Sequence, residues 1–404
     1  MKKIYFVISF VLLLIPFNCF CLEYPSLDSS SVVVFDKTDR NVLYSSNSNN
    51  VTSIASLTKI VTTIVAIENI DNLDENVVIT ANIINSVDPV ASKAGLKIGD
   101  NVTYRDLLYA SILPSGADAT NALAILSCGS IDNFVSKMND FVQRVGVENT
   151  HFVNVTGLDE ENHYSTANDV LKILDYSLDN KLFYDVFTAK KYTLSNGLEV
   201  KSTLYKYNGD DIANIIGSKT GYTGNAGYCI ATLSKTDGHD IIIVLLGANH
   251  INDKYYNIVD SIDLINFVND NYSNKILLNK DSEIKRISVS LSDISNYVIK
   301  SKSEIIRFLP NDFDVNKFKY EYNGINVLSY KNKKGEKLGN IIYYYDDKIL
   351  LTEDVILDKE IKISYKKIIK KYLVYEIAFF MFLIIVIIFI IYLLSKRKRQ
   401  MKCY

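Results

Sequence analysis

The chain has 404 residues, which predicts two to three domains at about 150 residues each. Lysine plus arginine (44) nearly balance aspartate plus glutamate (46), and 48% of the residues are hydrophobic. With 17 glycines, 5 prolines and 5 cysteines, this composition excludes a largely disordered chain, a collagen-like protein and a disulfide scaffold.

The N-terminus has the organisation of a secretory signal peptide. Two lysines precede an apolar run, and Cys19 and Cys21 are small residues at the positions that a cleavage site requires. We therefore predict a signal peptide over residues 1–21. The alternative is an uncleaved anchor helix.

The exported part begins with two β-rich stretches and a helix. Residues 32–35 and 42–44 are joined by a turn-rich segment, which predicts a hairpin. From Leu57 onward the apolar residues recur at helical spacing, which predicts a helix over Ser56–Glu68.

A block of helices follows and then gives way to strands. Residues 101–145 are predicted to be helical with a break at Pro114-Ser115-Gly116, and residues 166–190 again have helical periodicity. Strands before and after this block predict one α/β (α+β) domain over residues 22–275, whose N- and C-terminal strands share a sheet. The later strands are predicted at 192–194, 226–233 and 241–246, and a last helix at 253–269.

Residues 276–360 have a different character. Alternating or aromatic-rich stretches, separated by turn signals such as Asn323-Gly324, predict a small β-rich domain. A lysine-rich stalk is predicted over residues 361–376, and we hypothesise that the β-rich domain acts as a spacer from a membrane. Its strands are predicted at 287–291, 318–322, 325–330 and 341–345.

The C-terminus carries a second apolar run. Residues 377–394 contain no charged side chain, and at about 1.5 Å per residue a helix of this length spans roughly 27 Å of bilayer. Four consecutive cations follow at 396–399, which argues against the alternative of a buried core helix. By the positive-inside rule the tail (395–404) is cytoplasmic, so the rest of the mature chain is extracytoplasmic.

The part of the chain between the two ends is net acidic, which disfavours a nucleic-acid partner. Cys128 and Cys229 are its cysteines. They could pair, but two small, mostly buried thiols are the commoner arrangement.

Three short motifs carry groups that can do chemistry together. Ser56-Leu57-Thr58-Lys59 places a serine and a lysine one helical turn apart, where a lysine of lowered pKa can activate the hydroxyl. Alone, this pattern more often marks a helix-capping serine beside an exposed lysine. Ser115-Gly116-Ala117 lies in a turn, and Lys219-Thr220-Gly221 begins a strand region. There Lys219 can supply a fixed cation for a substrate carboxylate, and Gly221 lets a ligand backbone come close.

Through the order of these motifs the chain resembles the low-molecular-mass penicillin-binding proteins of the D-Ala-D-Ala carboxypeptidase type. The resemblance covers about residues 29–270 and implies the penicillin-binding-protein and β-lactamase-like transpeptidase fold, with no metal and no cofactor. The matching segments are 54–59, 113–116, Asn154 with Gly157-Leu158, 163–167 and 219–223.

The resemblance also implies a role for each motif residue. Ser56 attacks the carbonyl between the two terminal D-alanines of a peptidoglycan stem pentapeptide, Lys59 accepts its proton, and Ser115 relays a proton to the leaving D-alanine. Backbone N–H groups of Ser56 and Tyr222 form the oxyanion hole. β-Lactams acylate Ser56 and leave slowly, because they mimic the D-Ala-D-Ala end. The implied substrate-binding residues are Lys219, Thr220, Gly221, Tyr222 and, by a gap-free count, Lys254.

Two positions depart from the family pattern. The family's second motif usually ends in Asn, and the methyl group of Ala117 cannot hydrogen-bond a substrate amide or position Lys59, so we expect reduced activity or altered specificity. Lys254 falls where the family often places an arginine for the terminal carboxylate, and lysine loses the bidentate fork. His163 matches a family position near the site, with a structural hydrogen bond as the alternative.

The predicted function is a membrane-anchored, serine-type carboxypeptidase that trims pentapeptides and so limits cross-linking. A low-turnover penicillin- or muropeptide-binding protein is the first alternative, because of Ala117. A class A β-lactamase is the second, disfavoured by the β-rich domain, the anchor and the missing Asn. The expected partners are stem peptides ending in D-Ala-D-Ala, β-lactams as covalent inhibitors, and the cell membrane.

Overall fold

The computed structural model describes residues 22, 24–208, 212, 214–252, 254–345 and 347–400. The predicted signal peptide (1–21) and the last four residues of the predicted tail lie outside the described residues. The chain divides into two compact units. The first is Met1–Ser273 with Phe308–Asn311, and the second is Asn274–Arg307 with Asp312–Tyr404.

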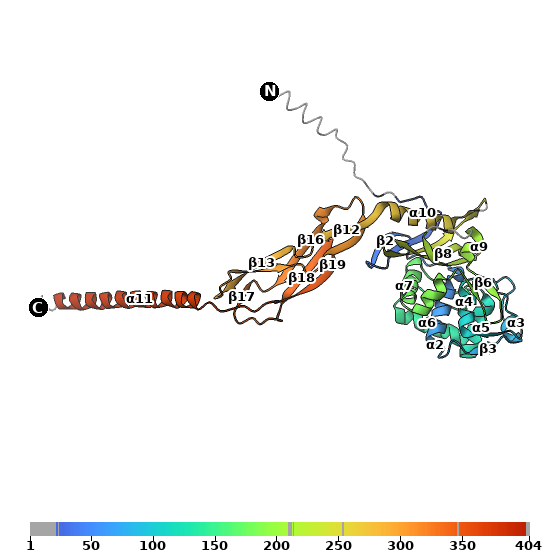
Figure 1. Cartoon of the computed structure of the whole chain (residues 1–404), viewed down its shortest axis with the longest axis horizontal. Coiled ribbons are helices and arrows are strands. Elements are labelled where there is room, and N and C mark those ends of the chain that lie inside the picture. The colour runs from blue at the N-terminus through green and yellow to red at the C-terminus, as the bar shows by residue number, and fades with distance from the viewer. Residues whose placement is uncertain are drawn as a thin grey trace, which may run out of the picture. The chain divides into compact units, whose positions relative to one another are not determined.

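A five-stranded antiparallel sheet organises the first unit (Figure 1). Its order is β2-β1-β9-β8-β7, so the N-terminal strand β1 pairs with β9 from the end of the unit. The predicted hairpin is confirmed as β1 and β2, and so is the prediction that N- and C-terminal strands share a sheet. The strands are β1 (Ser31–Asp36), β2 (Asn41–Ser46), β7 (Ile215–Thr223), β8 (Gly227–Thr236) and β9 (His239–Ala248).

The two faces of this sheet pack into two different cores, because side chains alternate along a strand. Val33 and Phe35 of β1 pack with most of the helices, whereas Val32 and Val34 pack with α10 (Tyr256–Asn271). The sheet therefore separates a helical layer from α10 (Figure 1). The helices of that layer are α2 (Thr58–Asn69), α3 (Ala81–Asn85), α4 (Tyr104–Ile112), α5 (Ala117–Cys128), α6 (Ile131–Val145), α7 (Ala167–Leu178) and α8 (Lys181–Thr188).

The helical layer breaks where the sequence predicts a turn. Helix α4 begins with a capping box of Thr103 and Asp106 and ends just before Pro114-Ser115-Gly116, after which α5 begins. This turn leaves Ser115 between two buried helices. The remaining elements of the unit are α9 (Thr203–Asn208), β3 (Asn76–Val78) with β4 (Asn101–Thr103), β5 (Lys191–Thr193) with β6 (Glu199–Lys201), and β10 (His250–Ile251) with β11 (Lys254–Tyr255).

The second unit is rich in strands, as the alternating pattern predicts. Strand β18 lies between β16 and β19 in an antiparallel sheet, and β13 lies between β14 and β17. The strands of this unit are most of β12 (Tyr272–Leu278), the first half of β15 (Ile305–Pro310), which pairs with β12, and β13 (Glu283–Ser290), β14 (Asn296–Lys300), β16 (Phe318–Gly324), β17 (Val327–Ser329), β18 (Lys337–Tyr345) and β19 (Lys348–Ile356).

The C-terminal apolar run lies in one long helix, α11 (Tyr365–Gln400). Its Tyr365–Lys398 part is long and apolar enough to cross a membrane. Because α11 already begins at Tyr365, most of the stretch predicted as a stalk (361–376) is helical and continuous with the apolar run.

Candidate active site

Ser56 lies in a short 3-10 helix, η1 (Ala55–Leu57), that leads directly into α2. Lys59 Nζ donates hydrogen bonds to Ser56 Oγ (2.9 Å) and to the carbonyl oxygen of Thr156 (2.5 Å). Lys59 is buried, and burial lowers its pKa to about 7, with Asp118 opposing the shift. A large share of Lys59 is therefore neutral at pH 7, as a base for the Ser56 hydroxyl must be.

Ser115 and Lys219 form a second pair of a serine and a buried lysine. Lys219 Nζ, on β7, donates to Ser115 Oγ (2.9 Å) and to the carbonyl oxygen of Thr220 (2.6 Å). Burial lowers the pKa of Lys219 well below its usual range, and the charge of Lys59 lowers it further. Burial therefore disfavours the charged form of Lys219 in the free protein, and the fixed cation expected there stays a prediction.

One pocket brings Ser56, Ser115, Thr220, Gly221 and Tyr222 together. A Cβ on Gly221 would lie 2.9 Å from the backbone nitrogen of Ser56, so β7 approaches the nucleophile turn more closely than a side chain permits. Tyr222 follows at the rim with 58% of its surface exposed. The three motifs, which lie far apart in the sequence, therefore line the same cavity.

Several residues of the pocket are not predicted by the sequence. Thr203 Oγ1 lies 2.5 Å from Thr220 Oγ1, so the two hydroxyls share a hydrogen bond. Asn257 is buried at the start of α10 and donates from Nδ2 to the carbonyl oxygen of Cys229 (3.1 Å). No local motif marks these positions, because the fold alone brings α9 and α10 to the cavity. The unpredicted polar lining residues are Ser92, Thr203, Tyr228, Tyr255 and Asn257.

Lys254 is not among the pocket residues of the described part of the chain. Its side chain is exposed on β11, whereas Tyr255 and Asn257 just after it line the pocket. The gap-free count from Gly221 crosses the β7–β8 and β8–β9 turns, where a small difference in length shifts the register. Lys254 stays a prediction that the pocket geometry does not support.

Ala117 and Asp118 open α5 beside Ser115. Ala117 is fully buried, and its N–H donates to the carbonyl oxygen of Ser92 (2.8 Å). The carboxylate of Asp118 accepts hydrogen bonds from the backbone N–H groups of residues 94–96. The Asp118 carboxylate therefore hydrogen-bonds this loop. It does not replace the side-chain amide that the family pattern has at position 117.

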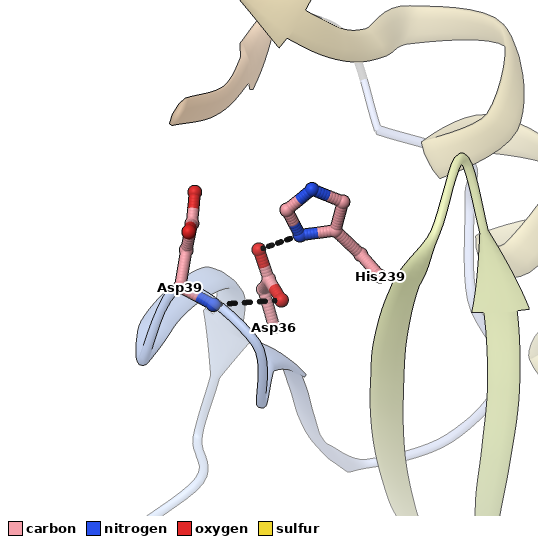
Figure 2. Close-up of side chains that lie close together, drawn as sticks. All are labelled: Asp36, Asp39 and His239. Atoms are coloured by element: carbon pink, nitrogen blue, oxygen red, sulfur yellow. Dashed lines mark hydrogen bonds and ion pairs between the residues drawn. The ribbon is translucent and has the colours of Figure 1, made fainter. Parts of the chain in front are cut away.

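Asp36, Asp39 and His239 form a second cluster of ionisable groups, drawn in Figure 2. Their potential ligand atoms lie within 4.8 Å of one another. His239 Nδ1 is 2.9 Å from Asp36 Oδ2, the N–H of Asp39 donates to Asp36 Oδ1 (3.2 Å), and Asp39 Oδ2 accepts from the N–H of Phe308 (2.8 Å). Because these bonds connect the β1–β2 turn with the β8–β9 turn, we assign the cluster a structural role.

The two cysteines within the described residues do not form a disulfide. Cys128 at the end of α5 and the buried Cys229 on β8 are both free thiols. Burial raises the pKa of the Cys229 thiol to about 12, so it stays protonated at neutral pH.

The sequence of the chain is similar to the sequences of known proteins. Residues 19–250, more than half of the chain, match a family described as D-alanyl-D-alanine carboxypeptidase. The D-alanyl-D-alanine carboxypeptidase DacF of Bacillus subtilis (strain 168) is 29% identical over 350 residues, which cover 83% of this chain and 86% of the relative.

Solved structures of penicillin-binding proteins and a related DD-transpeptidase have a fold similar to that of this chain. Penicillin binding protein 5 from Haemophilus influenzae is 26% identical and covers 84% of this chain and 99% of its own, with a TM-score of 0.64. The Streptomyces K15 DD-transpeptidase is 29% identical and covers 61% of this chain and 98% of its own, with a TM-score of 0.55. The predicted penicillin-binding-protein fold is confirmed.

Proposed function

Because this chain belongs to the D-alanyl-D-alanine carboxypeptidase family, we propose that it releases the terminal D-alanine of peptidoglycan pentapeptides through an acyl-enzyme on Ser56. The family and the relatives indicate D-Ala-D-Ala carboxypeptidase and penicillin-binding function, and with it the binding of peptidoglycan peptides and β-lactams. The observation that carries the serine mechanism is the buried Lys59, 2.9 Å from Ser56 Oγ.

In the acylation step, neutral Lys59 takes the proton of Ser56 while Oγ forms a bond to the carbonyl carbon between the two D-alanines. The developing oxyanion is stabilised by the backbone N–H groups of Ser56 and Tyr222. The bond from that carbon to the nitrogen of the last D-alanine then breaks, and Ser115 passes a proton to this nitrogen. Water later adds to the ester, which releases the shortened peptide and restores the Ser56 hydroxyl.

The terminal carboxylate of the substrate lies beside Lys219, Thr220 and Ser115 in this proposal. A carboxylate there provides the negative partner that Lys219 lacks in the free protein, so binding stabilises its ammonium form. A β-lactam carboxylate uses the same groups, and the opened ring stays on Ser56 as a slowly released ester.

Ala117 supports a second candidate, a protein that binds penicillin or muropeptides with little turnover. A buried methyl group occupies the position where the family pattern has an amide. Losing a hydrogen bond to a substrate amide costs about 1–3 kcal/mol when the partner is left unpaired. We expect slower turnover from this change and not its complete loss.

For the chain as a whole, we propose that residues 22–275 form the catalytic domain and 276–360 a spacer. We further propose that 377–394 span the cell membrane, which places the catalytic domain outside and the basic tail (395–404) in the cytoplasm. The apolar part of α11, followed within the same helix by the cations at 396–399, supports this orientation. Accessibility of the first unit to protease added outside intact cells tests it, and protection there contradicts it.

The decisive experiment measures D-alanine release from diacetyl-Lys-D-Ala-D-Ala by the detergent-solubilised protein and by Ser56→Ala. We expect release by the native protein and none by the variant. If both proteins release D-alanine, Ser56 is not the nucleophile. Release by neither, with a fluorescent penicillin still bound covalently to Ser56, favours the low-turnover candidate, and Ala117→Asn then becomes the variant to measure.

A further inference from the structure

Beneath the nucleophile turn, three residues form a directed chain of buried hydrogen bonds. We propose that His163, acting through Thr58, holds the carbonyl oxygen of Ala55 and so aims the backbone N–H of Ser56 into the oxyanion hole. His163 and Thr58 are then positioning residues that touch no substrate. The inference deepens the proposed function and rests on it, because it takes the Ser56 N–H as an oxyanion donor.

The direction of the chain follows from the partner of each ring nitrogen of His163. The backbone N–H of Val153 donates to Nδ1 (3.3 Å), so Nδ1 carries a lone pair. The ring proton is therefore on Nε2, which lies 2.9 Å from Thr58 Oγ1 and donates to it. This oxygen then uses its own proton to donate to the carbonyl oxygen of Ala55 (2.9 Å). His163 and Thr58 thus each donate once toward the nucleophile turn, and the carbonyl oxygen of Ala55 accepts the last hydrogen bond.

The surroundings of His163 keep it neutral. The side chain is buried, and burial lowers its pKa to about 4. His151 and Lys59 lower this pKa further, whereas Asp159 opposes the shift. At neutral pH the ring therefore keeps one proton and the tautomer that the chain of hydrogen bonds requires.

Ala55 needs such support because its backbone is in the left-handed region, with φ of +49°. A residue with a Cβ rarely adopts this conformation unless its surroundings enforce it. Gly157 closes the other side: a Cβ there would lie 1.9 Å from the Ala55 carbonyl oxygen and 2.9 Å from Thr58 Oγ1. The oxygen is thus held between a hydrogen-bond donor and a backbone that leaves no free space.

Because the peptide unit is rigid, holding the carbonyl oxygen of Ala55 also holds the N–H of Ser56. The carbonyl of Ala55 and the N–H of Ser56 belong to one planar, trans peptide unit, so the oxygen and the hydrogen point in opposite directions. Fixing the oxygen on Thr58 therefore fixes the N–H. That nitrogen lies on the side of β7, since a Cβ on Gly221 would approach it to 2.9 Å, and Tyr222, the other expected oxyanion donor, is the next residue.

The test replaces the Thr58 hydroxyl and keeps the shape of the side chain. In Thr58→Val both hydrogen bonds are lost, and we expect kcat for D-alanine release to fall about tenfold to hundredfold with KM little changed, because an oxyanion donor is misaimed. Acylation by a fluorescent penicillin falls by the same factor. Thr58→Ser, which retains the hydroxyl, restores kcat to within a few fold of the native value.

His163→Gln and His151→Gln form a matched pair of variants. The first loses the ring and its aimed donor, and we expect a lower kcat. The second changes a histidine outside the chain of hydrogen bonds and leaves kcat unchanged. Native kcat in both Thr58→Val and His163→Gln overturns the proposal. Equal losses in Thr58→Val and Thr58→Ser also overturn it, because they indicate a packing effect.

A measurement that does not depend on catalysis tests this proposal separately from the proposed function. Nitrogen-15 NMR of the histidine rings reports which nitrogen of His163 carries the proton. We expect Nε2–H at pH 7, and a ring protonated on Nδ1 overturns the proposal whatever the activity. A native protein that neither releases D-alanine nor binds penicillin contradicts the proposed function alone.

Discussion

The two compact units differ most in what they bury. The described part of the first unit buries lysines, aspartates and histidines, among them Lys59, Lys219 and Asp118. In the described part of the second unit the buried polar side chains are serines, and its largest fully buried side chain is the aromatic ring of Tyr343. Removing an ionisable group from water costs free energy unless a partner compensates. Such groups are therefore concentrated in the unit that carries the pocket, where their altered proton affinities are useful.

The largest expected effect on catalysis comes from removing the buried base. In Lys59→Met the Ser56 hydroxyl loses its proton acceptor, and we expect the rate of acylation by penicillin to fall about a thousandfold. Lys285→Met, which changes an exposed lysine on β13 of the second unit, serves as the control and leaves the rate unchanged. If the Lys59→Met protein keeps a tenth of the native acylation rate, Lys59 is not the base.

The pH dependence tests the same lysine without a substitution. The pKa of Lys59 is lowered to about 7, so its neutral, proton-accepting fraction grows as the pH rises toward that value. We expect the rate constant for acylation to rise about tenfold per pH unit below this point and to level off above it. A profile measured between pH 5 and 9 that stays flat, or that falls with rising pH, contradicts the assignment.

A smaller loss of activity is expected when a methyl group is added at Gly221, where β7 comes close to the backbone of Ser56. In Gly221→Ala the new Cβ meets the backbone nitrogen of Ser56, so β7 must move away from the nucleophile turn. We expect kcat for D-alanine release to fall about tenfold to hundredfold, because a misplacement on the order of 1 Å has that effect. Gly224→Ala, where the added Cβ meets open space, is the matched control. Equal activity in the two variants means that β7 does not need this close approach.

In the second unit we expect an effect on stability and none on catalysis. Tyr343 is fully buried on β18 beside Phe318 and Tyr320, so Tyr343→Ala leaves a cavity and lowers the free energy of unfolding by about 3–5 kcal/mol. Tyr344→Ala, at a half-buried position, costs less. Urea unfolding and D-alanine release are measured on the same samples. A fall in kcat that tracks the loss of stability contradicts a separation of roles between the units.

Local patterns predicted many elements of both units, but not the strands β12, β14, β15 and β19. The hairpin β1–β2, the helix after Ser56 and the break before α5 depend on periodicity and turn residues that lie within a few positions of one another. The sheet order required one further rule, that strands before and after a helical block share a sheet. The lysine-rich composition of 361–376 predicted a stalk but not its secondary structure, and α11 starts within it at Tyr365.

The finer geometry of the site could not be read from local patterns. The contact between Thr58 and His163 joins positions 105 residues apart, and the left-handed backbones of Ala55 and Ser115 are imposed by packing and not by residue type. Position 254 shows the same limit. A count along the chain selects Lys254, whereas Asn257 in the first turn of α10 lines the pocket.

Lys219 has a thermodynamic consequence for ligand binding. Burial disfavours its ammonium form in the free pocket, and in the proposed binding mode the substrate carboxylate favours that form. We therefore expect binding to take up protons at a pH between the pKa values of Lys219 in the free and in the bound protein. The measured heat of binding then depends on the ionisation enthalpy of the buffer, and affinity declines as the solution becomes more alkaline. A peptide amide that lacks the terminal carboxylate has neither property, so calorimetry in two buffers distinguishes the ligands that engage Lys219 from those that only occupy the cavity.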